Sequence, residues 1–328
     1  MAQDWTRLDE DDVRVRPGRG TRPRTRRRPA HTDAVMGFVT TVDRGRYTCH
    51  VDDTTVMAMR ARELGRKAVV VGDHAQLVGD TSGRPDTLAR IVRIEPRTSV
   101  LRRTADDTDP VERVVVANAD QMVIVMALAD PEPRPRMIDR CLVAAFDAGL
   151  DPLLCLTKAD LASPTELLAI YAPLGLRYLV TSNEDGWTGI AGLGEQLKGR
   201  VSVLIGYSGV GKSTLVNKLV PDAERAVGVV NPVTGRGRHT SSSAIALPYE
   251  TGWIIDTPGV RSFGLAHVRP DDVLAAFPDL AEGAAACPSG CDHLGQDCAL
   301  DRWVADGHAD PARLDSYRRL LASRNETE

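Results

Sequence analysis

Residues 206–213 read Gly206-Tyr207-Ser208-Gly209-Val210-Gly211-Lys212-Ser213, and they follow the apolar run 201–205 and precede a helix-like stretch that begins at Thr214. This is a P-loop in the strand-loop-helix context that the motif requires. Its glycines allow positive φ angles, so that successive N–H groups can surround a phosphate at the helix start. Lys212 is expected to reach the β- and γ-phosphates, and Ser213 to bind Mg²⁺. Residues 206–213 and Thr214 therefore predict a nucleoside triphosphate site.

The composition is that of a globular chain with more than one domain. Its 328 residues are 42% hydrophobic, which can fill two or three cores. No apolar run approaches the ~20 residues of a membrane span, and the N-terminus lacks the apolar segment of a signal peptide. We expect a cytoplasmic monomer with no membrane partner. Cys49, Cys141 and Cys155 stand alone in apolar contexts and are expected to be buried thiols.

The N-terminal residues 1–34 form a basic arm by composition. The net charge of the chain is only −4, yet residues 14–28 hold eight arginines and no acidic residue. Such a segment cannot form a packed core, and we expect it to be disordered and to bind nucleic acid through phosphate contacts. A tail that only increases solubility is the alternative.

Residues 35–95 contain short β-like runs separated by turn residues. The expected strands are 35–40, 47–51, 69–73, 74–78 and 88–92. About five short strands in about sixty residues favour a small barrel of the OB-fold type. Because aromatic residues are few, folded RNA is a better expected ligand than single-stranded bases, and a purely structural barrel is the alternative. Residues 96–112 are polar and are interpreted as a linker.

Residues 113–267 alternate strand-like and helix-like patterns, which predicts a parallel sheet covered by helices on both faces. The expected strands are 122–128, 153–156, 178–180 and 201–205, and the expected helices are 137–148, 164–171, 190–197 and the one after the P-loop. Ligands of such sheets bind at the carboxyl ends of the strands.

Two of these strand ends carry residues suited to a guanine base. Strand 153–156 runs into Thr157-Lys158-Ala159-Asp160, a variant of the guanine-specifying Asn-Lys-x-Asp motif. The carboxylate of Asp160 can accept hydrogen bonds from both N1–H and the N2 amine of guanine, whereas adenine presents an acceptor at N1. The next strand ends in Thr181-Ser182, a weak match to the loop that supports the base.

The residues after the P-loop supply the remaining elements of a GTPase. Gly237-Arg238-His239-Thr240 lies in a glycine-rich stretch that indicates a mobile switch, and Thr240 is placed to complete the Mg²⁺ shell. The apolar run 253–255 leads into Asp256-Thr257-Pro258-Gly259. In this turn Asp256 is expected to hold Mg²⁺ through water, and Gly259 to sense the γ-phosphate. The base motifs precede the P-loop, which is the reverse of the usual order.

Together with the barrel and a C-terminal Cys/His cluster, these motifs resemble the RsgA (YjeQ) family of circularly permuted GTPases. The resemblance runs from about Val35 to Leu321 and includes Ala117-Asn118-Ala119-Asp120 and Ile138-Asp139-Arg140. The resemblance implies a GTPase domain at 113–267 that binds GTP or GDP with Mg²⁺. It also implies that the protein acts in late maturation of the small ribosomal subunit, with that subunit and its rRNA as partners. Val260 follows Gly259 where many GTPases carry a water-orienting glutamine. The resemblance assigns that role to His239, and a His239 that only contacts RNA is the alternative.

The C-terminal segment 268–328 contains the ligand-like spacing Cys287-x₃-Cys291-x-His293-x₄-Cys298. Three thiolates and one imidazole suit tetrahedral Zn²⁺, and a segment of this size needs such a metal for stability. The family pattern is one residue longer in the first and last spacings, and free thiols or a disulfide are the alternatives. Helices are expected at 299–306 and 311–322.

Two functions from different classes fit these features. The first is a GTPase that the small subunit stimulates, and the second is a GTP-dependent rRNA-binding checkpoint or scaffold in which hydrolysis is incidental. A P-loop kinase or ATPase is disfavoured by Asp160 and by the lack of an evident acceptor-substrate domain. Turnover measured with and without small subunits separates the first two.

Overall fold

The computed structural model describes residues 31–64, 69–103, 113–184, 188–221, 244–257, 265, 267–295 and 298–325. Contacts divide the chain into Met1–Thr32 and Asp33–Glu328, and all the elements named below belong to the second unit. Residues 1–30 of the expected basic arm lie outside the described residues.

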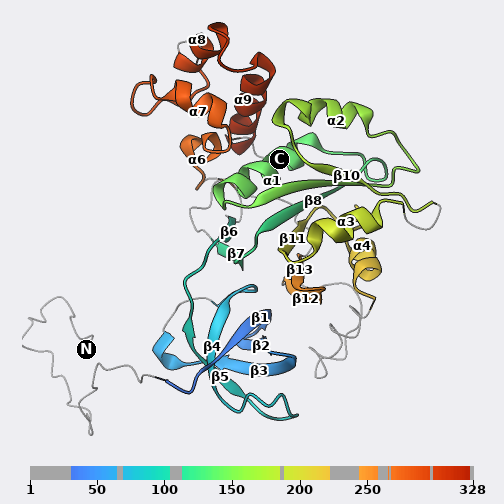
Figure 1. Ribbon diagram of the computed structural model, residues 1–328, viewed down its shortest axis with the longest axis vertical. Helices are drawn as coiled ribbons and strands as arrows, with labels where there is room; N and C mark the ends of the chain where they lie inside the picture. Colours follow the sequence, from blue (N-terminus) through green and yellow to red (C-terminus); the bar gives the residue numbers. More distant parts are fainter. Residues whose placement is uncertain are drawn as a thin grey trace, which may run out of the picture. The chain divides into compact units, whose positions relative to one another are not determined.

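Five strands close a barrel near the start of the second unit (Figure 1). They are β1 (Val35–Asp43), β2 (Arg46–Val51), β3 (Thr54–Arg60), β4 (His74–Gly79) and β5 (Ala89–Ile94). The strand order is β1-β2-β3-β5-β4, and β4 returns to pair with β1. All these pairs are antiparallel except β3 with β5. A closed five-stranded barrel of this kind fits the expected OB-fold.

The expected strand over residues 69–73 is wrong, and the true third strand, β3, was not predicted. Gly72 has a φ of +91°, and a Cβ at that position would lie 2.0 Å from the carbonyl oxygen of Ala117. The carboxylate of Asp73 accepts a hydrogen bond of 2.8 Å from the backbone nitrogen of Val70. A left-handed glycine and a local side-chain acceptor turn this apolar stretch away from the barrel ladder.

The stretch interpreted as a linker contains a strand. β6 (Val100–Arg103) pairs antiparallel with β7 (Arg113–Ala117) in a separate two-stranded sheet. The side chain of Asn118, just after β7, donates to the carbonyl oxygen of Gly72, and its Oδ1 accepts from the backbone nitrogen of Thr98, both at 2.8 Å. This asparagine therefore ties the barrel to the sheet that follows.

Six further strands, in the order β10-β9-β8-β11-β13-β12, form the middle of the unit and are continuous with the barrel strands in one 11-stranded sheet. They are β8 (Gln121–Ala127), β9 (Asp151–Thr157), β10 (Tyr178–Val180), β11 (Val201–Ile205), β12 (Ile245–Tyr249) and β13 (Gly252–Asp256). Every pair is parallel except β12 with β13. The strands predicted from 122 to 205 are confirmed, and β12 was not predicted. At the far edge β12 pairs with the barrel through Thr41 and Ile245.

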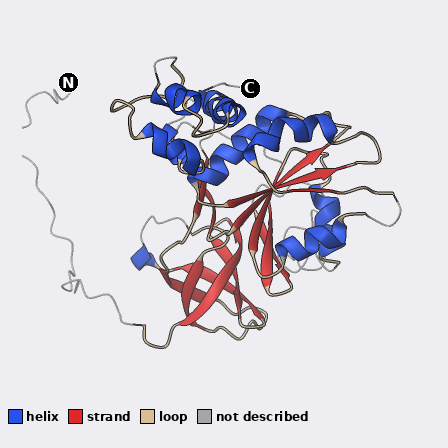
Figure 2. Ribbon diagram, turned by 45° about the horizontal axis from the view of Figure 1, so that its top comes forward, coloured by secondary structure: helices blue, strands red, loops and turns tan. Residues whose placement is uncertain are grey.

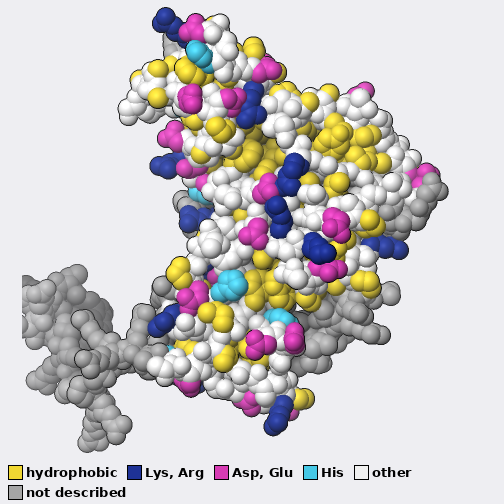
Figure 3. Space-filling model, in the orientation of Figure 1, with side chains coloured by type: hydrophobic (Ala, Val, Ile, Leu, Met, Phe, Trp, Pro, Cys, Tyr) yellow, Lys and Arg dark blue, Asp and Glu magenta, His cyan; other side chains and the backbone are white. Residues whose placement is uncertain are grey.

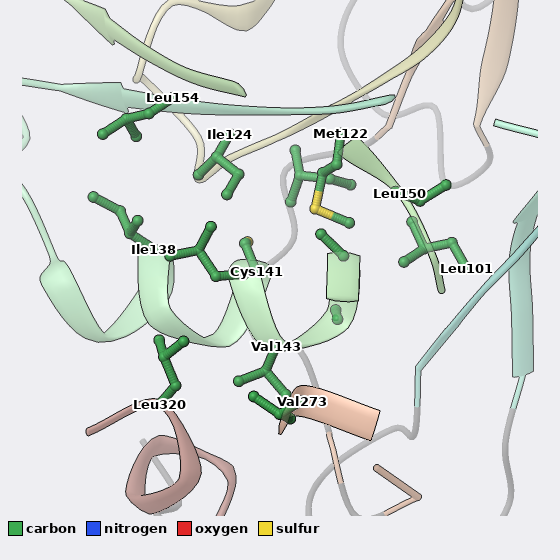
Figure 4. Close-up of a cluster of buried hydrophobic side chains, with 14 of the residues drawn as sticks. Leu101, Met122, Ile124, Ile138, Cys141, Val143, Leu150, Leu154, Val273 and Leu320 are labelled. Atoms are coloured by element: carbon green, nitrogen blue, oxygen red, sulfur yellow. The ribbon is translucent and has the colours of Figure 1, made fainter. Parts of the chain in front are cut away.

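Helices cover both faces of this sheet, as expected (Figure 2). They are α1 (Pro135–Asp147), α2 (Thr165–Tyr171), α3 (Ile190–Leu197) and α4 (Lys212–Leu219). On one face α1 packs on β8 and β9, and Figure 4 shows Ile138 and Cys141 of α1 pointing toward Ile124 and Leu154 of the sheet. On the other face Leu193 of α3 and Leu215 of α4 are buried in a second core.

The C-terminal segment is helical and packs against α1. Its helices are α6 (Pro270–Leu274), α7 (Pro278–Ala284), α8 (Ala299–Ala305) and α9 (Pro311–Asn325), of which α8 and α9 were predicted. Val273 and Leu320 face α1 on the side away from the sheet (Figure 4). Polar contacts reinforce this packing, because Arg319 pairs with the buried carboxylate of Asp139 at 3.3 Å.

Candidate nucleotide site and metal cluster

The P-loop has the backbone geometry that its sequence demands. It links β11 to α4, and Gly209 and Gly211 have φ angles of +83° and +99°. A Cβ on Gly206 would lie only 2.4 Å from the carbonyl oxygen of Val125 on the neighbouring strand. Glycine is therefore required at these positions, either for a left-handed turn or for close packing. Ser213 and Thr214 lie exposed in the first turn of α4, where backbone N–H groups favour an anion.

Lys212 holds its ammonium group inside this loop. Its Nζ donates to the carbonyl oxygens of Tyr207 at 2.9 Å and Gly206 at 2.5 Å. Burial lowers the pKa of Lys212, and the carboxylate of Asp256 partly offsets that shift. The ammonium group is thus positioned at the mouth of a loop whose amides suit phosphate oxygens.

Asp256 lies at the carboxyl end of β13, paired in register with Leu204 beside the P-loop. Its Oδ1 is buried, and no described residue donates a hydrogen bond to it. Burial raises the pKa of Asp256, and the charge of Lys212 opposes that shift. A buried carboxylate oxygen without a donor fits a site for hydrated Mg²⁺, together with the exposed hydroxyl of Ser213. The other expected ligand, Thr240, lies outside the described residues, as do His239 and Gly259.

The base motif and the P-loop lie side by side. The hydroxyl of Thr157, the last residue of β9, donates to the carbonyl oxygen of Val210 at 2.6 Å. Lys158 follows with a φ of +60°, and its Nζ donates to the carbonyl oxygen of Asp130. The structure therefore brings the first two residues of the expected guanine motif to the wall of the phosphate loop.

Asp160 meets the end of the next strand, β10. Its Oδ1 accepts hydrogen bonds from the hydroxyl of Ser182 and from the backbone nitrogen of Asn183, both at 3.1 Å. These bonds, the Asn183 amide first, hold the pKa of Asp160 below its ordinary value, so the carboxylate is ionised near neutral pH. The backbone nitrogen of Thr181 donates to the carbonyl oxygen of Leu156 at 2.7 Å. Sequence reasoning missed Asn183, because a backbone donor leaves no residue-type signal.

Sequence reasoning also missed the loop between β8 and α1, residues 128–134. Besides accepting from Lys158, this loop places Pro131 3.7 Å from the position of a Cβ on Gly209. The guanidinium carbon of Arg134 lies 4.8 Å from the ring centroid of Tyr207. The loop therefore touches both the phosphate loop and the base motif.

The four expected zinc ligands converge although they come from separate turns. The Sγ atom of Cys298 lies 3.6 Å from that of Cys287, 3.9 Å from that of Cys291, and 3.5 Å from Nδ1 of His293. A tetrahedral zinc site has edges of about 3.8 Å between sulfurs and about 3.5 Å between sulfur and nitrogen. The ligand atoms all lie within 4.8 Å of one another, so the cluster is compatible with zinc despite its short spacings.

Comparisons with known proteins bear on this arrangement. A family model for the RsgA GTPase matches residues 94–266. A Pseudomonas syringae pv. tomato protein, named small ribosomal subunit biogenesis GTPase RsgA, is 40% identical over 78% of this chain and 75% of its own length. A protein of the same name from Ectopseudomonas mendocina is 42% identical over the same shares. Across the described residues, no helix has both the length and the apolar character for crossing a bilayer.

Two crystal structures share the fold. YjeQ from Thermotoga maritima superposes with a TM-score of 0.64 and 24% identity, covering 89% of this chain and 98% of that one. YloQ, described as a circularly permuted GTPase, gives a TM-score of 0.64 and 23% identity, covering 91% of this chain and 97% of that one. The strand order of the sheet agrees with such a permutation, because β8 and β9 precede the P-loop strand.

Proposed function

Because this chain belongs to the RsgA GTPase family and is a GTP hydrolase, we propose that it binds the small ribosomal subunit and hydrolyses GTP during late maturation of that subunit. The observation that carries the nucleotide part is the 2.6 Å hydrogen bond between Thr157 and Val210. It fixes the guanine motif to the phosphate loop, so that one nucleotide can engage both. The ribosomal part is supported by the names of the relatives.

In this proposal each part of GTP has its own residues. Asp160 accepts from the guanine edge, the stem of Lys158 lies along the base, and Thr181 and Ser182 support it. The phosphates lie on the amides of 206–214 and on Lys212. Mg²⁺, held by Ser213, Thr240 and Asp256, neutralises charge on the transferred phosphoryl group. Gly259 senses the γ-phosphate, and His239 orients the attacking water.

We also assign a role to each domain, with boundaries at 35–95, 113–267 and 268–328. The barrel and the arm 1–34 contact rRNA, and the C-terminal domain, stapled by Zn²⁺ on Cys287, Cys291, His293 and Cys298, docks beside them. On the face drawn in Figure 3, Lys and Arg side chains are interspersed with acidic ones. We assign most of the counterion release to the arm, because it holds eight arginines and no acidic residue between 14 and 28. The protein acts as a cytoplasmic monomer.

The test compares GTP hydrolysis with small subunits, large subunits and free tRNA across a salt series. A stimulation of about 10³ corresponds to a barrier lowered by roughly 4 kcal/mol, and it should decline steeply with salt. Intrinsic hydrolysis should hardly change with salt. Equal hydrolysis rates with small subunits, large subunits and tRNA would refute the ribosomal proposal. GTP-dependent binding to the small subunit without stimulated turnover would instead favour the scaffold function. His239→Ala should lower stimulated turnover by roughly 10²-fold with little effect on GTP affinity.

A further inference from the structure

We propose that Arg134 contacts the terminal phosphate of bound GTP, as an arginine supplied by the chain's own β8–α1 loop. Arg134 is exposed and precedes the first residue of α1, and its guanidinium lies over the ring of Tyr207. Stacking of this kind orients the planar cation but leaves its N–H groups open to a second partner. The proposal rests on GTP occupying the P-loop.

The ring of Tyr207 positions Arg134 next to the phosphate-binding group. The carbonyl oxygen of the same tyrosine accepts the 2.9 Å hydrogen bond from the ammonium of Lys212. One P-loop residue therefore contacts Lys212 through its backbone and Arg134 through its side chain. Pro131 of the same loop lies beside Gly209, 3.7 Å from the position that a Cβ on that glycine would take. In the proposal the long arginine side chain turns about the tyrosine ring to reach the bound phosphate.

The guanidinium of Arg134 is the group in this loop that can pair with an anion. GTP with Mg²⁺ is still an anion, and Lys158 and Lys212 are matched in number by Asp160 and Asp256. Within the described part of the chain Arg134 forms no ion pair, although Asp130 and Glu132 lie exposed in the same loop.

The first experiment measures nucleotide affinity without subunits, using fluorescent GDP and a fluorescent non-hydrolysable GTP analogue. Arg134→Ala should weaken the GTP analogue by about three- to tenfold and leave GDP affinity nearly unchanged, because only the triphosphate carries the contacted group. Single-turnover hydrolysis of GTP without subunits should fall by about tenfold or more. Arg134→Lys should recover part of the affinity for the GTP analogue. Lysine keeps the positive charge but lacks the several N–H donors of the planar guanidinium.

Arg177→Ala is the matched control. Arg177 is exposed and pairs with Asp151 at the amino end of β9, at the opposite end of the parallel strands from the nucleotide site. This variant should leave both affinities and single-turnover hydrolysis unchanged. Parental values for Arg134→Ala in both measurements would overturn the proposal, as would equal weakening of GDP and the GTP analogue.

A second arm separates the nucleotide from a ribosomal partner. If Arg134→Ala weakened only small-subunit binding and reduced its salt dependence, the arginine would contact an rRNA phosphate, and the proposal would be wrong. If the proposed ribosomal function is wrong, small subunits will not stimulate GTP hydrolysis by the parent protein. The comparison of GDP and GTP-analogue affinities would still test the role of Arg134, because it is made without subunits.

Discussion

The side-chain nitrogen of Asn118 donates to the carbonyl oxygen of Gly72 across 2.8 Å, joining the residue that follows β7 to the turn that precedes barrel strand β4. Asn118 is 7% exposed and has a φ of +55°, a conformation that asparagine tolerates better than most residues. Its Oδ1 accepts from Thr98 and its backbone nitrogen donates to Ser99. A single asparagine thus satisfies backbone groups from both sides of the junction.

Asn118→Ala should lower the free energy of unfolding by about 2–4 kcal/mol. It leaves the carbonyl oxygen of buried Gly72 without its donor, removes the acceptor of the Thr98 backbone nitrogen, and places alanine in a left-handed conformation. Chemical denaturation followed by circular dichroism measures the change. Asn217→Ala, at an exposed position of α4, should shift stability by no more than about 0.5 kcal/mol. Equal effects of the two substitutions would contradict the assigned role of Asn118.

Asp160→Asn should weaken GTP by tens of fold or more and relax the preference toward xanthosine triphosphate. The amide offers a donor where guanine also presents donors, whereas the carbonyl of xanthine at that position can accept. The hydrogen bonds from Ser182 and Asn183 keep the parental side chain oriented and ionised. Competition binding with GTP, ATP and xanthosine triphosphate measures the change. Equal binding of ATP and GTP by the parent would exclude the assignment.

Elemental analysis of the purified protein should find about one equivalent of zinc. Apparent binding energies of structural zinc are on the order of 10 kcal/mol, so its loss should loosen the segment after residue 268. Cys291→Ser should therefore increase proteolysis there, while Cys49→Ser, in the barrel core, should leave the zinc content at one equivalent. Metal-free protein with a protease-resistant C-terminal domain would rule zinc out.

Arg319→Met should destabilise the attachment of α9 to α1 by about 1–3 kcal/mol near neutral pH, because it leaves the charge of Asp139 buried. The expected loss of stability is smaller than that for breaking a fully buried ion pair, since the side chain of Arg319 is 35% exposed. Burial already raises the pKa of Asp139, and Arg319 opposes that rise. Without Arg319 the pKa should rise further, so the loss of stability should be largest at high pH and shrink as falling pH protonates the carboxyl.

The matched variant is Asp139→Asn combined with Arg319→Met, which removes both charges. Its stability should exceed that of Arg319→Met alone and should lose the pH dependence that Asp139 causes. Thermal unfolding between pH 5 and pH 8 provides the comparison. A deficit of the single variant that grows as pH falls would show that the carboxylate is not the cause.

Features set by local spacing were predictable from the sequence. The P-loop and the alternating strands and helices from 122 to 219 follow from periodicity and glycine positions, which act within one or two elements. The positions of Thr157, Lys158 and Asp160 followed from the rule that parallel strands present their carboxyl ends together. The turn at Gly72 was missed although a glycine and an aspartate mark it locally, because the apolar run 69–71 was interpreted as a strand.

Contacts between distant segments left no such pattern. Asn118 and Asp139 were noted only as part of a family resemblance, and their partners Gly72 and Arg319 lie far away in the sequence. Arg134 had no recognisable motif at all, since its partner is an aromatic side chain at a P-loop position that any residue can occupy. The sequence predicted His239, Thr240 and Gly259 as site residues, and these stay predictions.

The pairing of Thr41 on β1 with Ile245 on β12 has a consequence for synthesis of the chain. A nascent polypeptide leaving the ribosome can complete the barrel and then add β8, β9 and β10 before the P-loop strand exists. β11 then pairs with the free edge of β8. The β12–β13 hairpin adds next to β11, and β12 pairs with β1, the barrel strand that was synthesised first. The residues that we expect to contact guanine are therefore made before those of the P-loop. The last expected nucleotide residue is Gly259, so the nucleotide could be bound while the segment 268–328 is still to be made.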